Sequence, residues 1–244
     1  MSRQLVVFDF DWSGPFSSLS FQTHDCTRTM ADQDTDRWVF EVLAIDIRRQ
    51  MEDLEKQVQW TDLVAKSLRE AHARGIKREQ IENTLRIIPF HPAMVRAVSK
   101  LKAGGKTTFF CLSNANSEKG LENLFDEIIT NPAEWTDSGL LDLRRRIDPS
   151  GPQHNCQVGC SANMCKGEEL TAFFERHLPD FDRVVYLGDG SNDFCPVLRL
   201  REQDMVLCRT FGGLHKRIAR EGNLKCQVKY WTHAWEVEEI FNTL

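Results

Sequence analysis

The sequence lacks the features of a membrane or exported protein. No stretch of its 244 residues approaches the run of about 20 apolar residues that crosses a bilayer. The chain enters a strand-like segment almost at once, without the basic, apolar and small-residue regions of a signal peptide. Glycine and proline are not in excess, and there is no internal repeat or low-complexity tract. These absences predict a cytoplasmic protein with one folded domain that has room for an inserted subdomain.

Concentrated positive charge is missing too. The formal net charge is -5, and no stretch gathers enough lysine and arginine to neutralise a run of phosphates. Neither nucleic acid nor a membrane is therefore expected as a partner, and the oligomeric state is left open. In a chain without an export signal, the eight cysteines predict reduced thiols or metal ligands rather than disulfides.

Short apolar runs separated by helical patterns are what the chain does contain. The runs typical of buried parallel strands are Leu5–Phe8, Thr107–Leu112, Val184–Leu187 and Met205–Leu207. The helical patterns are Pro92–Leu101, Lys166–His177 and Gly213–Arg220. Strands that alternate with helices predict an α/β fold with a doubly wound parallel sheet.

A long block without a strand signal separates the first two strands. Between residues 34 and 88 the apolar residues recur at helical spacing, and Gly75 interrupts the pattern. We expect two or three helices that form a small cap, because so long a crossover exceeds what one parallel connection requires. Helices that simply flank the sheet are the alternative. The predicted division is a catalytic core of residues 1–13 and 89–244 and a cap of residues 30–88.

Acidic residues follow two of the predicted strands. Asp9 and Asp11 follow the first strand, and the segment GDGSND after the third carries Asp189 and Asp193. Because ligands bind at the carboxyl ends of strands in an open α/β sheet, these acids are expected to converge. Close carboxylates repel one another by about 4 kcal/mol per pair at an effective dielectric constant near 20, so a cation is needed among them. Carboxylate ligands favour a hard ion such as Mg²⁺.

Phosphate chemistry fits the remaining polar groups at this edge. Ser113 and Asn114 end the second strand, and Lys166 stands at a predicted helix start. Mg²⁺ and Lys166 together offset the charge of an incoming phosphate, which leaves one carboxylate able to attack phosphorus. Ser113 and nearby backbone amides can donate to the other phosphoryl oxygens.

The order of these motifs resembles a known superfamily. DFDWS, a strand that ends in LSN, a lysine and then GDGSND are similar to the four motifs of the haloacid dehalogenase superfamily of phosphatases. The resemblance implies that Asp9 is the nucleophile that forms an aspartyl phosphate and that Asp11 is the general acid and base. It also implies that Ser113, Asn114 and Lys166 lie in the phosphate-binding motifs.

The same resemblance implies a Mg²⁺ site. Its ligands would be Asp9, the backbone carbonyl of Asp11 and Asp189, with Asp193 acting directly or through water.

Longer segments sharpen the resemblance. ADQDTDRW, FDEIITNPAEW, HNCQVGCSANMCKG and YLGDGSNDFCP are similar to the phosphatase family that includes phosphoethanolamine/phosphocholine phosphatases and pyridoxal phosphate phosphatases. In amine-selective members, an aspartate at the place of Asp36 is implicated in binding the cationic head of the substrate, and another follows the motif serine. Asn114 replaces that second aspartate, which removes a charge that would attract an ammonium group. A small phosphomonoester is therefore the substrate class that the resemblance implies.

The segment Gly14–Thr29 interrupts this resemblance. Without it the sequence reads DFDWSMADQDTDRW, a continuous match to the family pattern. The segment begins with Gly-Pro and has neither helical nor alternating apolar spacing, as is typical of an irregular loop. It is predicted to be an insertion, either a substrate lid or the translated product of an unspliced intron.

Cysteines before Lys166 suggest a second metal. His154, Cys156, Cys160 and Cys165 offer four donors for a structural zinc ion, although the usual pair of close CxxC turns is missing. Reduced thiols on the loop that carries Lys166 are the alternative. Core or scattered thiols are expected for the others, Cys26, Cys111, Cys195, Cys208 and Cys226.

Two functional alternatives remain beside a magnesium-dependent phosphatase. A phosphoacceptor receiver domain also combines strand-end acids, a hydroxyl and a lysine, but GDGSND and the predicted cap both count against it. A catalytically impaired protein of the same fold that only binds its ligand is the other, because the insertion follows the first motif directly.

Overall fold

The computed structural model describes residues 3–9, 34–88, 91–113, 125–177 and 181–244. Two predicted site residues, Asp11 and Asn114, lie outside the described residues, as does the predicted insertion Gly14–Thr29. Within the described residues, no helix is both long and apolar enough to span a membrane.

A parallel sheet of six strands forms the core, in the order β3-β2-β1-β6-β7-β8. The strands are β1 (Gln4–Phe8), β2 (Thr107–Leu112), β3 (Glu127–Ile129), β6 (Arg183–Gly188), β7 (Met205–Arg209) and β8 (Gln227–Trp231). The predicted doubly wound fold is confirmed, with all four predicted strands present. The two edge strands, β3 and β8, were not predicted, because each buries a single residue and shows little apolar pattern.

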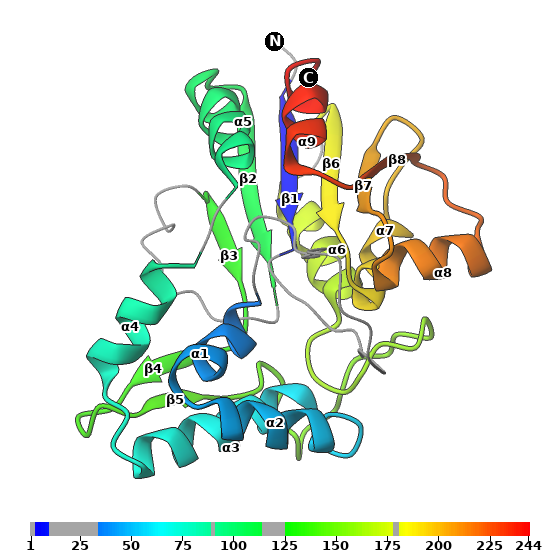
Figure 1. Ribbon diagram of the computed structural model, residues 1–244. Helices are drawn as coiled ribbons and strands as arrows, with labels where there is room; N and C mark the ends of the chain where they lie inside the picture. Colours follow the sequence, from blue (N-terminus) through cyan, green and yellow to red (C-terminus); the bar gives the residue numbers. More distant parts are fainter. Residues whose placement is uncertain (1–2, 10–33, 89–90, 114–124, 178–180) are drawn as a thin grey trace.

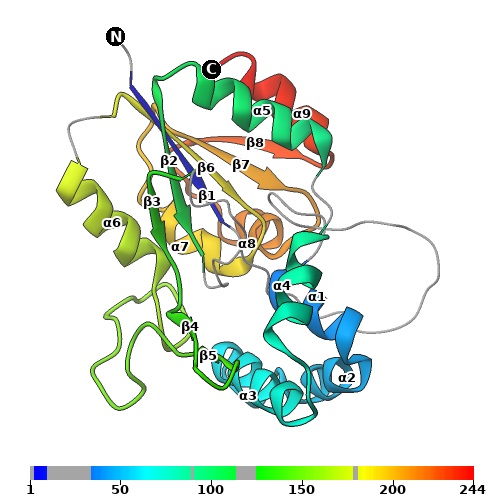
Figure 2. The same ribbon diagram turned by 90° about the vertical axis from the view of Figure 1, so that its left-hand side faces the viewer.

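Helices cover both faces of this sheet. One layer holds α5 (Pro92–Ala103) and α9 (Ala234–Phe241), and the other holds α6 (Lys166–His177), α7 (Phe194–Val197) and α8 (Gly213–Glu221). Figure 2 shows the two layers on opposite sides of the sheet. Alternate residues of β1 serve the two layers, because Leu5 and Val7 pack in one apolar cluster while Val6 and Phe8 pack in the other.

A third apolar cluster holds the cap together. It joins α1 (Thr35–Leu43), α2 (Ile45–Leu54), α3 (Trp60–Ala73) and α4 (Arg78–Arg86) to the antiparallel hairpin of β4 (Ala133–Trp135) and β5 (Leu141–Leu143). In Figure 1 these elements lie below the carboxyl ends of the central strands. The described part of the block has four helices rather than two or three, because α1 and α2 meet at Ala44 without a glycine or proline to mark the break. The boundaries of cap and core remain a prediction. The hairpin packs with the cap helices, although its residues lie in the segment that was assigned to the core.

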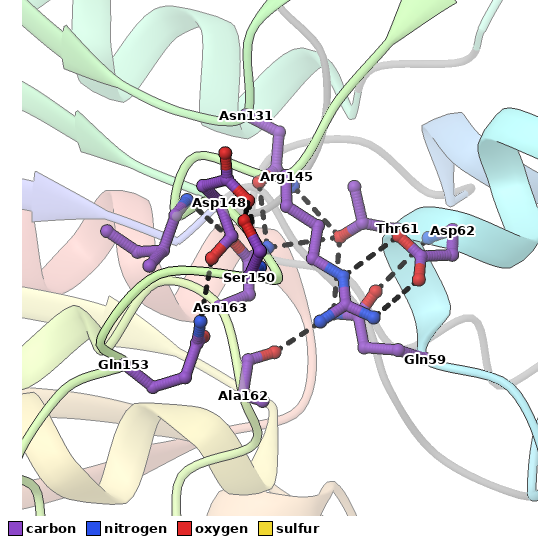
Figure 3. A network of polar contacts seen from close by, with 11 residues as sticks. Gln59, Thr61, Asp62, Asn131, Arg145, Asp148, Ser150, Gln153, Ala162 and Asn163 are labelled. Carbon is purple, nitrogen blue, oxygen red and sulfur yellow. Dashed lines mark hydrogen bonds and ion pairs between the residues drawn. The ribbon is translucent and has the colours of Figure 1, made fainter.

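A buried polar network fastens this cap to the loop that precedes α6 (Figure 3). The Thr61 hydroxyl, in the first turn of α3, accepts from the side-chain amides of Asn131 at 3.3 Å and Asn163 at 3.2 Å. Asn163 also donates to Asn131 Oδ1 at 2.9 Å. Nearby, Arg145 Nε pairs with Asp62 Oδ1 at 2.8 Å. The N-terminus of α3 is thereby joined to two separate segments of the chain.

Candidate active site

The carboxyl end of β1 places Asp9 at the centre of the sheet. Its backbone amide donates to the Leu187 carbonyl of the neighbouring strand β6 at 2.9 Å, so the strand pairing continues up to this residue. Asp9 is completely buried. Ser113, which follows β2, is held in the same way by a 2.9 Å bond from its amide to the carbonyl of Ile129, and it is also buried.

Lys166 is the first residue of α6, and its ammonium lies between two of the predicted acids. Its Nζ atom is 2.5 Å from Asp9 Oδ1 and 3.2 Å from Asp193 Oδ1. The Lys166 side chain is 1% exposed and those of Asp9 and Asp193 are 0% exposed. Lys166 is therefore not a solvent-exposed surface lysine. Its two carboxylate partners offset the cost of burial, because burying an unpaired charge would cost several kcal/mol.

Asp193 is fixed by the fold as well as by Lys166. The amides of Asp189 and Gly190 donate to its Oδ2 at 3.0 and 2.9 Å, and the Tyr186 hydroxyl donates to its Oδ1 at 2.8 Å. Burial together with the charge of Asp193 holds the pKa of Tyr186 well above its usual range, so the phenol stays a donor. A Cβ at Gly188 would lie 2.6 Å from Asp193 Oδ2, so only glycine fits there.

Tyr186 was missed by the sequence reasoning, because it lies inside an apolar strand run, where only its hydroxyl marks it as polar.

Three of the predicted metal ligands come together. One carboxylate oxygen from each of Asp9, Asp189 and Asp193 lies within 4.8 Å of the others, and all three residues are buried. Lys166 offsets one of these three negative charges. A divalent cation would neutralise the two that are left. The all-oxygen donor set suits a hard ion. These residues therefore fit the Mg²⁺ that the sequence predicted, and we call Asp9, Lys166, Asp189 and Asp193 the carboxylate site.

Asp36 lies in the first turn of α1, in the cap. It is 6% exposed, and the Trp60 indole donates to its Oδ2 at 3.0 Å. Asp34 caps the same helix by accepting from the Asp36 amide at 2.9 Å. Arg37 stacks over the Trp60 ring, with its guanidinium carbon 4.7 Å from the ring centroid. These contacts fix the orientation of the Asp36 carboxylate, whose role toward substrate remains a prediction.

The predicted zinc ligands need one correction. The sulfur atoms of Cys156, Cys160 and Cys165 gather with that of Cys195 within 4.8 Å of one another. His154 is not part of this group. Its Nε2 lies 2.8 Å from the carbonyl oxygen of Ser161. Cys195, which the sequence analysis grouped with the scattered thiols, takes the fourth place. We call Cys156, Cys160, Cys165 and Cys195 the thiol cluster.

Comparison with known sequences finds relatives whose names describe phosphatases or pyrophosphatases. A family model described as "Putative Phosphatase" matches residues 20–244. A "Thiamine phosphate phosphatase-like protein" of Arabidopsis thaliana is 32% identical over 98% of this chain and 94% of its own length. "Inorganic pyrophosphatase 1" of the same plant is 30% identical, covering 88% of this chain and 76% of its own length. "Pyridoxal phosphate phosphatase PHOSPHO2" of Mus musculus is 26% identical, covering 96% and 95%.

Solved structures resemble this one in fold. A substrate-bound phosphoserine phosphatase has a TM-score of 0.62 and 15% identity, covering 98% of this chain and 99% of its own. A phosphoserine phosphatase from T. onnurineus has a TM-score of 0.58 at 15% identity, covering 100% and 96%.

Proposed function

Because the chain belongs to the family described as "Putative Phosphatase" and is a phosphatase of the haloacid dehalogenase type, we propose that it hydrolyses small phosphomonoesters in a Mg²⁺-dependent reaction through an aspartyl phosphate on Asp9. The observation that carries this proposal is the buried ammonium of Lys166 between Asp9 and Asp193, with Asp189 beside them. With Mg²⁺ bound among these acids, the net charge of the site would be zero, which would allow a dianionic phosphate to approach Lys166 and the metal ion.

In the first half of the reaction, a carboxylate oxygen of Asp9 attacks phosphorus. The bond between phosphorus and the ester oxygen breaks, and the leaving oxygen takes a proton from Asp11. Mg²⁺, held by Asp9, Asp189 and the backbone carbonyl of Asp11, would supply positive charge against the phosphoryl oxygens. Lys166 adds a further positive charge, and Ser113 donates to a phosphoryl oxygen.

In the second half, water attacks the phosphorus of the aspartyl phosphate and passes a proton to Asp11. Inorganic phosphate leaves, and the carboxylate of Asp9 is regenerated. Asp193 holds Lys166 in place and stays engaged with the amides of Asp189 and Gly190. We therefore assign Asp193 to positioning, with any contribution to Mg²⁺ made through water.

The names of the relatives and the position of Asp36 support a substrate class. The compounds in the names of two relatives, thiamine phosphate and pyridoxal phosphate, each join one phosphate to at least one nitrogen-containing ring. A buried, oriented carboxylate in the cap suits such a substrate, because it would attract a positively charged nitrogen. We propose pyridoxal phosphate, thiamine phosphate and phosphoethanolamine or phosphocholine as the substrates to compare, with pyrophosphate beside them.

Turnover of p-nitrophenyl phosphate across a Mg²⁺ titration tests the reaction. We expect hydrolysis that rises with Mg²⁺ and saturates, followed by measurable kcat/KM on at least one compound of the substrate panel. A protein that binds these phosphates and never releases inorganic phosphate at saturating Mg²⁺ would instead be the catalytically impaired binding protein.

A further inference from the structure

The thiol cluster has the dimensions of a metal site. Its sulfur atoms form a closed ring in which Cys156 lies 3.5 Å from both Cys160 and Cys195, and Cys165 lies 3.7 Å from Cys160 and 3.6 Å from Cys195. The two remaining pairs stay within 4.8 Å. A tetrahedral zinc ion with Zn–S bonds of about 2.3 Å separates its sulfur ligands by about 3.8 Å. We propose that the thiol cluster is a zinc site that positions Lys166 against Asp193.

Other states of four cysteines fit these distances less well. A disulfide requires sulfur atoms about 2.05 Å apart, and each thiol of this cluster is free. An iron–sulfur cluster that takes one thiolate on each iron would hold the sulfurs farther apart than a single ion does. Soft thiolate ligands in a tetrahedral arrangement select zinc among the common divalent ions.

The surrounding loop gives a reason for a metal. Residues 144–165 form no helix or strand, and of these only Asn163, Met164 and Cys165 are buried. Irregular loops longer than about 12–15 residues are uncommon in compact domains unless they are functional. A segment without an apolar core of its own gains order from a metal, because metal binding energy is then folding energy.

A hydrogen bond to one of the sulfur atoms agrees with thiolate ligands. The Val158 amide donates to the sulfur of Cys156 at 3.3 Å, which is a favourable partner for negative charge on sulfur. Arg217 then ties this loop to the motif that carries Asp193, because its guanidinium donates to the carbonyls of Val158 at 2.6 Å and Ser191 at 3.1 Å. The loop is thus fastened to the Asp193 motif two residues after Cys156.

The position of the cluster along the chain links it to the carboxylate site. Cys165 directly precedes Lys166, and Cys195 lies two residues after Asp193. Gly167 packs so closely on Cys195 that a Cβ there would collide with the sulfur. A metal that joins Cys165 to Cys195 therefore holds the segments whose side chains meet at 3.2 Å in the carboxylate site.

Metal analysis and X-ray absorption of the wild-type protein, purified without chelator from zinc-supplemented cells, test the site itself. We expect one zinc per chain with four sulfur neighbours at about 2.3 Å. Protein that holds less than a half-equivalent of zinc, holds iron instead, or shows a nitrogen neighbour overturns the proposed ligand set. This result is independent of any phosphatase assay, so it stands or falls apart from the proposed reaction.

Variants distinguish the four sulfurs from the histidine that the sequence suggested. Cys195→Ser is expected to lose zinc to a chelating indicator at least tenfold more readily than the wild type. His154→Ala and the control Cys226→Ala, a buried thiol outside the cluster, are expected to retain it. Zinc lost from His154→Ala and kept in Cys195→Ser would contradict the assignment.

A conservative replacement tests the positioning role. Cys156 is half-buried, so Cys156→Ser should fold, lose zinc and bind inorganic phosphate at least tenfold more weakly, whereas Cys156→His should regain both zinc and phosphate binding. A cluster that only stabilised the fold would change the melting temperature and leave phosphate affinity unaltered. Unaltered phosphate affinity in zinc-free Cys156→Ser would therefore overturn the positioning role.

Discussion

The carboxylate site and the thiol cluster share two chain segments, one around Lys166 and one around Asp193, yet they are built in opposite ways. Asp9 is placed by strand pairing and Asp193 by two backbone amides and a tyrosine, so the fold itself places these two acids. The thiol cluster draws three of its four members from a loop with almost no buried residues. The acids of the first site are placed by the fold, whereas the metal proposed for the thiol cluster orders its loop.

Asp9→Asn is expected to have the largest effect, because it should abolish catalysis at the carboxylate site and leave the thiol cluster intact. An amide is a poor nucleophile, so kcat/KM should fall by roughly a thousandfold or more. Zinc content should remain as in the wild type, because Asp9 follows β1 and is not a member of the thiol cluster. Measured turnover near the wild-type rate in a folded, zinc-containing variant would remove Asp9 from the chemistry.

Gly167→Ala is expected to damage both sites at once. Its new methyl group would collide with the Cys195 sulfur and lie 3.2 Å from the Cys195 carbonyl carbon, so α6 and α7 must separate. A shift of about 1 Å at a reacting group can cost about a hundredfold in rate, and overpacking costs about 1–3 kcal/mol of stability.

Zinc content, kcat/KM and thermal unfolding of Gly167→Ala report on the two sites together. The matched control is Gly151→Ala in the loop that precedes α6, where the nearest atom to the new methyl would be at an ordinary 3.5 Å. Full activity with reduced zinc would show that the sites are not coupled.

Thr61→Val tests whether the thiol cluster depends on the polar network of the cap. The variant keeps the shape of the side chain but leaves the amide groups of Asn131 and Asn163 with one acceptor fewer in a buried place. The free energy of unfolding should fall by about 1–3 kcal/mol, as is usual for buried donors that lose a partner.

Denaturant unfolding of Thr61→Val is best compared with that of Thr171→Val, whose hydroxyl makes a half-buried bond within α6. Zinc binding should persist in both. Zinc lost from Thr61→Val would mean that the network, rather than the metal, orders the loop.

Asp36→Asn is expected to have the smallest effect. It tests whether the cap contributes selectivity for the head group of the substrate. The amide keeps a partner for the Trp60 indole but loses the negative charge. We expect kcat/KM to fall about tenfold more, or about 1.4 kcal/mol, on a phosphate ester with a cationic head than on one with an uncharged alcohol. Equal losses on both substrate classes would exclude a role in recognising the head group.

Much of the carboxylate site could be predicted because it follows from strand periodicity. Once a buried strand is located, the polar residue that ends it must lie at the edge of the sheet, which is how Asp9 and Asp189 were found. Helix α6 was predicted with its observed bounds. Tyr186 and the edge strand β8 carried no such signal, since Tyr186 lies in an apolar strand run and β8 buries only Trp231.

Cys195 shows how the remaining ligand could have been found. It stands far from the other three cysteines in sequence, so ligand spacing alone does not include it. If Lys166 and Asp193 must meet in one site, however, then their neighbours Cys165 and Cys195 must approach each other as well. Convergence of two motifs therefore predicts contacts of the residues beside them.

Trapping the covalent intermediate tests the account most directly. Wild-type protein is mixed with substrate and Mg²⁺, quenched in acid, digested and analysed by mass spectrometry. The account predicts one phosphoryl group on the peptide that contains Asp9, and none in Asp9→Asn. A phosphoryl group on another residue, or steady turnover without any phosphorylated Asp9, would contradict it.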